Sequence, residues 1–204
     1  MHLTATWHGA GSLAECSVMS VSPGVRLKEA NVSEVATYSA VHALSDGRTI
    51  RIRALKPEDR SGLLEAVRRS SPQSLYRRFF GLKRHFSEEE IAYFLNVDFL
   101  NHVALIAEIE EDGRPTIVGG ARYVVQEPGQ AEIAFAVIDQ YQGRGLGAAL
   151  MRHLAEIGRE AGLKAFTAEI LPDNRAMLKV FQKSGFPLRI EHEPGALHVS
   201  LALA

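Results

Sequence analysis

The stretch Gln142-Gly143-Arg144-Gly145-Leu146-Gly147 decides the fold, because it joins an apolar strand at 133–138 to a helix at 146–160. Glycines at alternate positions let the backbone approach a ligand closely. The start of the helix adds unpaired N–H groups and a partial positive charge. Together these features predict a cradle for phosphate oxygens, and therefore a ligand that carries a pyrophosphate group.

Competing glycine-rich motifs do not fit this stretch. A Walker loop requires Gly-Lys followed by Ser or Thr, whereas Gly147 is followed by two alanines. A dinucleotide-binding fingerprint requires Gly-x-Gly-x-x-Gly, and here the glycines fall at positions 143, 145 and 147. The remaining alternative is a tight turn from strand to helix that binds no ligand.

The composition limits the class of protein. The 204 residues suit one domain of ordinary size, and 46% hydrophobic residues are enough for a sizeable core. A formal net charge of −1 gives no basic field that would attract nucleic acid. The single cysteine, Cys16, and the spacing of the histidines argue against a disulfide framework and a metal site. Because no apolar run reaches transmembrane length and no leader pattern is visible, we expect a cytoplasmic protein without a membrane partner.

Regular patterning begins after the turn Ser45-Asp46-Gly47. We therefore predict an extension of uncertain structure at residues 1–45 and one α/β domain at 46–204. A mainly antiparallel first part is followed by a strand–helix–strand–helix pattern, so the sheet should be mixed. The long helix should turn Leu146, Leu150, Leu154 and Ile157 inward. The predicted strands are 48–53, 103–110, 117–125, 130–138, 164–170, 188–191 and 196–203, and the predicted helices begin near 57, 71, 87, 146 and 172.

Two blocks of sequence carry a family resemblance. Gln142, Gly145 and Gly147 match the pattern Gln/Arg-x-x-Gly-x-Gly/Ala, and residues 135–147 resemble the acetyl-CoA signature of the GNAT (Gcn5-related) N-acetyltransferases. The second block is an Asn, here Asn174, that opens a helix ending in Gly185-Phe186. The order and spacing of the two blocks are specific. The resemblance covers about residues 48–203 and implies a GNAT-like sheet with splayed central parallel strands and flanking helices.

The resemblance also implies acetyl-CoA as cosubstrate, held in a V-shaped slot between the splayed strands. The pantetheine arm would pair with strand backbone at Phe135, Ala136 and Val137. Asn174 would bond this arm or the slot wall, or serve only as a helix cap. The Arg144 side chain would contact a phosphate or remain a solvated cation. The pyrophosphate would lie on the amides of Gln142, Gly143, Arg144, Gly145, Leu146, Gly147 and Ala148.

The implied chemistry is direct attack of a neutral amine on a thioester, which requires a base to remove a proton from the ammonium. We predict Glu132 as this base, since alternation puts it on the face of Ala134 and Ala136 at the strand that leads to the slot. Apolar neighbours would raise the pKa of its carboxyl group. The alternative is an exposed strand carboxylate. A backbone N–H near Val137 is the expected donor to the oxyanion.

One position departs from the family pattern. Many members carry a Tyr in the last helix that protonates the departing thiolate, and the matching residue here is Phe181. Ser184, Tyr141 or water would then supply the proton, or the thiolate would leave unassisted.

A narrower resemblance concerns the acceptor. Residues 71–81 resemble a helix of the bacterial protein lysine acetyltransferases, a branch that also carries a Glu at the position of Glu132 and typically lacks the Tyr. This resemblance implies transfer to a protein lysine, for example on a metabolic enzyme. Two alternatives remain open, a small amine such as a polyamine, amino acid or antibiotic, and a non-catalytic sensor of acyl-CoA. The sequence leaves the oligomeric state open, a homodimer included.

Overall fold

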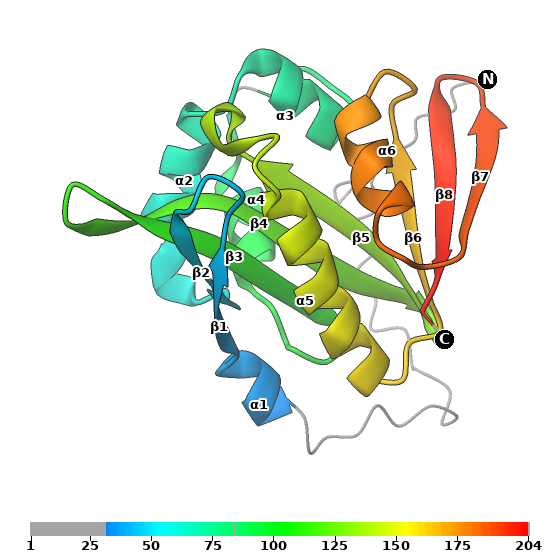
Figure 1. Ribbon diagram of the computed structural model, residues 1–204, viewed down its shortest axis with the longest axis horizontal. Helices are drawn as coiled ribbons and strands as arrows, with labels where there is room; N and C mark the ends of the chain where they lie inside the picture. The colour runs from blue at the N-terminus through cyan, green and yellow to red at the C-terminus, as the bar shows by residue number, and fades with distance from the viewer. Residues whose placement is uncertain (1–31, 84, 204) are drawn as a thin grey trace.

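The computed structural model describes residues 32–83 and 85–203, which form a sheet covered by helices on both faces (Figure 1). The eight strands run in the order β1-β2-β3-β4-β5-β6-β8-β7. The strands are β1 Ser39–Ala43, β2 Thr49–Ala54, β3 His102–Glu111, β4 Arg114–Glu127, β5 Gln130–Val137, β6 Ala165–Ile170, β7 Leu188–Glu193 and β8 Ala196–Ala202. The helices are α1 Val32–Ala36, α2 Arg60–Arg68, α3 Pro72–Phe79, α4 Glu88–Leu95, α5 Leu146–Glu160 and α6 Arg175–Gln182, with 3-10 turns at Pro57–Asp59 and Asp139–Tyr141.

Two strands in the middle of the sheet separate from one another. Strands β1 to β5 pair antiparallel in sequence order, whereas β5 and β6 pair in parallel. Their pairing covers Gln130↔Ala165, Ala131↔Phe166 and Glu132↔Thr167 and extends no further among the described residues. The strands therefore diverge beyond Glu132, which confirms the predicted mixed sheet with splayed parallel strands. We call this point the fork.

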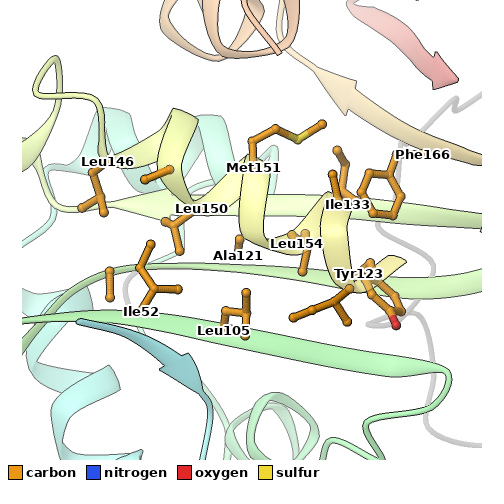
Figure 2. Packing of buried hydrophobic residues seen from close by; sticks show 14 of the residues in the cluster. Ile52, Leu105, Ala121, Tyr123, Ile133, Leu146, Leu150, Met151, Leu154 and Phe166 are labelled. Carbon is orange, nitrogen blue, oxygen red and sulfur yellow. The ribbon is translucent and has the colours of Figure 1, made fainter. Parts of the chain in front are cut away.

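The long helix α5 anchors the main core (Figure 2). The four predicted inward residues, Leu146, Leu150, Leu154 and Ile157, are all buried. Figure 2 shows α5 lying across the sheet, with its apolar side chains directed toward Ile52, Leu105, Ala121, Tyr123 and Ile133. Close contact with β6 requires a glycine in the helix, since a Cβ at Gly158 would lie 2.8 Å from Cζ of Phe166. A smaller cluster on the opposite face packs α2 and α4 against the sheet.

Local signals in the sequence explain where the shorter helices begin and end. Ser71 accepts the N–H of Ser74 at 3.2 Å, and Ser87 forms a capping box with Glu90. These caps confirm the predicted starts of α3 and α4. Helix α3 ends at Phe79, and its C-cap Phe80 adopts the left-handed conformation with φ of 53°.

The sheet begins earlier in the chain than the patterning predicted. Residues 32–45 of the predicted extension contribute α1 and the edge strand β1, which pairs with β2 from Ser39↔Arg53 to Ala43↔Thr49. Strand β1 is exposed or half-buried along its length, so it lacks the apolar alternation that reveals a strand in sequence. The remainder of the extension, 1–31, lies outside the described residues, and the division of the chain at residue 45 stays a prediction.

Candidate active site

A cleft of about 750 Å³ opens at the fork and crosses the sheet. Glu132 of β5 and Thr167 of β6 lie at its vertex, and α3, α4 and α6 contribute to its walls. The cleft brings together eight of the predicted site residues, Glu132, Phe135, Ala136, Val137, Gln142, Gly143, Gly147 and Asn174. The other four, Arg144, Gly145, Leu146 and Ala148, belong to the same loop and helix start but do not line the cleft.

The glycine loop presents a row of backbone amides. Gly143 and Gly145 have φ of 72° and 90°, values that favour glycine. The first hydrogen bond of α5 runs from the Ala149 N–H to the Gly145 carbonyl at 3.0 Å, so the preceding amides of the first turn have no acceptor within the helix. The Gln142 N–H donates to the Asp139 carbonyl at 3.2 Å. This leaves the amides of residues 143–148 for an anionic ligand.

The edge of β5 that faces the slot has no strand partner beyond Glu132 among the described residues. The Ile138 N–H donates to the Val118 carbonyl of β4 at 3.1 Å. Because residues alternate in the direction of their backbone groups, Phe135 and Val137 direct N–H and C=O toward β6, which has diverged. The Gln142 side chain reaches this edge and donates to the Val137 carbonyl at 2.9 Å and to Ser74 Oγ at 3.1 Å. The Val137 N–H thus faces the slot, as an oxyanion donor requires.

The turn before β2 holds the glycine loop in place. Ser45 donates to the Arg144 carbonyl through its N–H (3.3 Å) and its hydroxyl (3.1 Å). The Arg144 guanidinium lies 2.6 Å from the Asp46 carboxylate, which also pairs with Arg48 at 2.7 Å. These two guanidinium groups hold the pKa of Asp46 well below its usual range. The Arg144 side chain is therefore paired with a surface carboxylate while it stays 37% exposed.

Helix α6 contributes a cap and an apolar wall. Asn174 Oδ1 accepts the Met177 N–H at 3.2 Å, so Asn174 is the N-cap of α6 while it lines the cleft. Phe181 is 1% exposed and packs edge-on against Phe135, with ring centroids 6.2 Å apart. The two hydroxyl groups considered as replacements for the family Tyr are both engaged. Ser184 donates to the Phe181 carbonyl at 2.7 Å, and Tyr141 donates to the Glu111 carboxylate.

The wall of the cleft around Glu132 is more basic than the sequence suggested. Gln126 donates to the Glu132 carboxylate at 3.4 Å. Burial lowers the pKa of Arg78 to about 10, against the opposing effect of the Glu132 charge. Burial and the charge of Arg78 lower the pKa of Arg122 to about 9. Alternation along β5 predicted only apolar neighbours for Glu132, because it could not reveal which residues α3 and β4 bring to this face.

Helix α3, which carried the narrower resemblance, forms the rim of this wall. Phe79 packs against Phe86 and Phe94 with centroids 5.1 and 6.1 Å apart, so part of its aromatic content is core. Arg77 pairs with Asp173 at 2.8 Å and links α3 to the loop before α6. Tyr76 stays 42% exposed at the outer side. The helix therefore joins the two walls of the cleft at one end.

A buried histidine behind this wall predicts loss of stability in acid. His102 is 8% exposed and its Nε2 lies 3.0 Å from Nη1 of Arg122. Burial, followed by the charge of Arg122, lowers the pKa of His102 to about 4. Between pH 4 and 6.5 the unfolded chain binds a proton at this position that the folded chain does not. The free energy of unfolding should therefore fall by up to about 3 kcal/mol as the pH falls through this window.

Urea denaturation of the wild type and His102→Gln at several pH values would test this prediction. The variant is expected to show a smaller loss between pH 6.5 and 4, whatever its stability at neutral pH. Identical slopes for the two proteins would contradict the assignment of this pH dependence to His102.

Within residues 32–83 and 85–203, no group of three or more His, Cys, Asp or Glu side chains is placed to hold a metal ion. None of the helices in the same ranges has the length and apolar character needed to cross a membrane.

Comparisons with known proteins agree with this geometry. The model of the acetyltransferase (GNAT) family matches residues 69–186. Acetyltransferase PA5475 of Pseudomonas aeruginosa is 34% identical over 163 residues, which cover 76% of this chain and 88% of that protein. Acetyltransferase Pat of Mycolicibacterium smegmatis is 31% identical over 141 residues, 68% of this chain, but the match spans only 41% of that longer protein. The crystal structure of the GNAT domain of S. lividans PAT superposes with a TM-score of 0.73 and 32% identity, covering 80% of this chain and 96% of that domain.

Proposed function

The chain belongs to the GNAT acetyltransferase family, and we propose that the amine it acetylates is the side chain of a lysine on another protein. As a member of this family it transfers the acetyl group of acetyl-CoA to an amine. The observation that carries the proposal is the fork, which puts a carboxylate, Glu132, into the same cleft as the open edge of β5. A metabolic enzyme in the cytoplasm is the class of acceptor that the likeness of α3 to protein lysine acetyltransferases supports.

The charge of the cleft supports a protein acceptor over a polyamine. Carboxylates among the described lining residues are Glu132 and Glu169 only, whereas basic lining residues are Arg60, Arg77, Arg78, Arg122, Arg175 and Lys179. Such a lining repels a ligand that carries several positive charges. A lysine on a protein brings one ammonium, and acidic neighbours of that lysine would meet the arginines. Leu82 near the end of α3 is 80% exposed and offers an apolar contact to a large partner.

The donor binds along the backbone in this proposal. The amides of residues 143–148, including those of Arg144, Gly145, Leu146 and Ala148, hold the diphosphate at the start of α5. The pantetheine arm pairs with Phe135 and Val137, and the small side chain of Ala136 leaves the other face of the strand free for the acceptor. Gln142 and Asn174 position the two sides of the slot.

The acetyl transfer then follows from the groups at the fork. Glu132 takes a proton from the acceptor ammonium, and the freed amine forms a bond to the carbonyl carbon. The Val137 N–H donates to the developing oxyanion. The carbonyl re-forms as the C–S bond breaks, and the electron pair of that bond stays on the sulfur of coenzyme A. The nitrogen loses its second proton to water, which gives the neutral amide. Because Phe181 has no proton to give, water protonates the thiolate or it leaves as the anion.

Arg144→Gln is expected to change the dissociation constant of coenzyme A by less than about threefold. The guanidinium is already paired with Asp46, and a phosphate contact would have to replace that ion pair, so the net gain is small. The loop amides carry the affinity instead. Calorimetric titration of both proteins with coenzyme A measures this, and a tenfold or larger loss would show that the guanidinium moves from Asp46 to a phosphate.

The acceptor is tested with cell lysate and isotope-labelled acetyl-CoA. Mass spectrometry should find labelled lysines on a limited set of proteins after incubation with the wild type, and far fewer after incubation with Glu132→Gln. A parallel assay with polyamines, amino acids and aminoglycosides provides the comparison. A small amine acetylated with higher kcat/KM than any protein lysine would overturn the proposed acceptor.

A further inference from the structure

The polar face of the cleft continues from β5 onto β6. Glu132 pairs in register with Thr167, so both side chains project from the same face of the sheet. Successive side chains alternate, and Glu169 therefore projects from this face as well, about 7 Å farther along β6. Glu132 and Glu169 both line the cleft. Because the strands diverge beyond the fork, Glu169 lies nearer the open end of the slot than Glu132.

The partners of Glu169 leave one of its oxygens unsatisfied. His198 is its cross-strand neighbour on β8, and Nδ1 of His198 lies 3.8 Å from Oε1 of Glu169, which is too far for a hydrogen bond. Oε2 is shielded from solvent and accepts no hydrogen bond in the part of the chain that the structure describes. A buried carboxylate oxygen without a donor is unfavourable. A ligand that brings an N–H donor into the cleft would relieve this cost.

We propose that Glu169 binds the ammonium group of the acceptor in the cleft and holds it beside Glu132, an inference that rests on the proposed acetyltransferase site. An ammonium has three N–H donors, so it bonds to Glu169 and still presents a proton to Glu132. Arg122 of β4 opposes Ala134 and so projects from this same face, and the pKa of Arg78 responds to the Glu132 charge; both arginines thus lie near Glu132 and repel a cation there. The two carboxylates on β5 and β6 are thus the groups of the described lining that attract it.

The two carboxylates have different roles in this arrangement. Glu132 removes the proton, and its loss lowers kcat. Glu169 attracts the ammonium of the bound acceptor until that ammonium loses its proton. Loss of the Glu169 charge should therefore weaken acceptor binding and leave the chemical step unchanged. A residue that only supported the fold at β6 would affect stability or both kinetic constants, and would not act on the acceptor alone.

Steady-state kinetics of Glu169→Gln test the inference. The acceptor is a synthetic peptide that contains the most strongly labelled lysine from the lysate. If the enzyme prefers a small amine to protein lysines, that amine is used instead. The KM for the acceptor should rise about tenfold, with kcat and the KM for acetyl-CoA changed less than twofold. Glu169→Asp keeps the charge and should lose less. Glu191→Gln is the matched control, because Glu191 opposes His198 on β7, lies outside the cleft and pairs with Arg189.

The outcomes separate this inference from the proposed function. An unchanged acceptor KM in Glu169→Gln, or an equal rise in Glu191→Gln, would overturn the assignment of Glu169 even if protein lysines are the acceptors. If a small amine is the preferred acceptor, that preference rejects the protein acceptor. A raised KM for the amine in Glu169→Gln would still support the assignment of Glu169.

Discussion

Glu132→Gln is expected to lower kcat about 10²–10⁴-fold while the dissociation constant of acetyl-CoA stays within twofold of wild type. The size of the effect is that of losing a positioned general base, since an amide of the same shape cannot accept the proton of the ammonium. Donor affinity should hold because the diphosphate lies on the loop amides and the pantetheine on the β5 edge. Stopped or continuous detection of free thiol gives kcat, and calorimetry gives the affinity.

The pH dependence distinguishes a base from a carboxylate that merely attracts the acceptor. Without Glu132 the reaction relies on amine that is already deprotonated, so the variant should recover activity steadily as the pH rises toward the pKa of the acceptor. Glu127→Gln serves as control, because Glu127 is an exposed carboxylate at the end of the neighbouring strand β4. A kcat for Glu132→Gln within tenfold of wild type at neutral pH would remove Glu132 from the mechanism.

Most of the fold could be predicted from the sequence because the signals for its helices and strands are local. The apolar period of α5, the Ser71 and Ser87 caps and the apolar runs of β3 to β5 each depend on residues a few positions apart, and the structure has these elements within a few residues of the predicted ones. The fork is different. No composition or period in 130–138 or 164–170 shows that two parallel strands will separate after three pairs, and the splay followed only from the family resemblance.

Contacts between distant segments explain what the sequence did not reveal. Ser45 and Asp46 fix the glycine loop from a turn 99 and 98 positions away. Glu169 and His198 meet only through the β6–β8 register. One signal was available for Glu169, since it is the single charged residue in the otherwise apolar or neutral strand 165–170. A carboxylate in a half-buried strand is uncommon enough to mark a candidate site.

Gly145→Ala, a substitution in the glycine loop, is expected to raise the dissociation constant of coenzyme A about 10–100-fold. Gly145 has φ of 90°, a conformation that strains any residue with a Cβ. Relief of this strain would rotate the peptide groups on either side and turn amides of the first turn of α5 away from the diphosphate. Loss of one hydrogen bond to a charged group costs about 1.5–3 kcal/mol, which corresponds to this range of affinity.

Gly162→Ala supplies a control at the other end of the same helix. Gly162 has φ of 83°, and a Cβ at either glycine would meet no atom within 4 Å, so steric clashes do not distinguish the two substitutions. Both variants should therefore lose similar stability in thermal unfolding, about 1–2 kcal/mol. Only Gly145→Ala should lose affinity, because only the N-terminal end of α5 presents amides to the donor. Equal affinity of the two variants for coenzyme A would mean that the diphosphate is held elsewhere than on this loop.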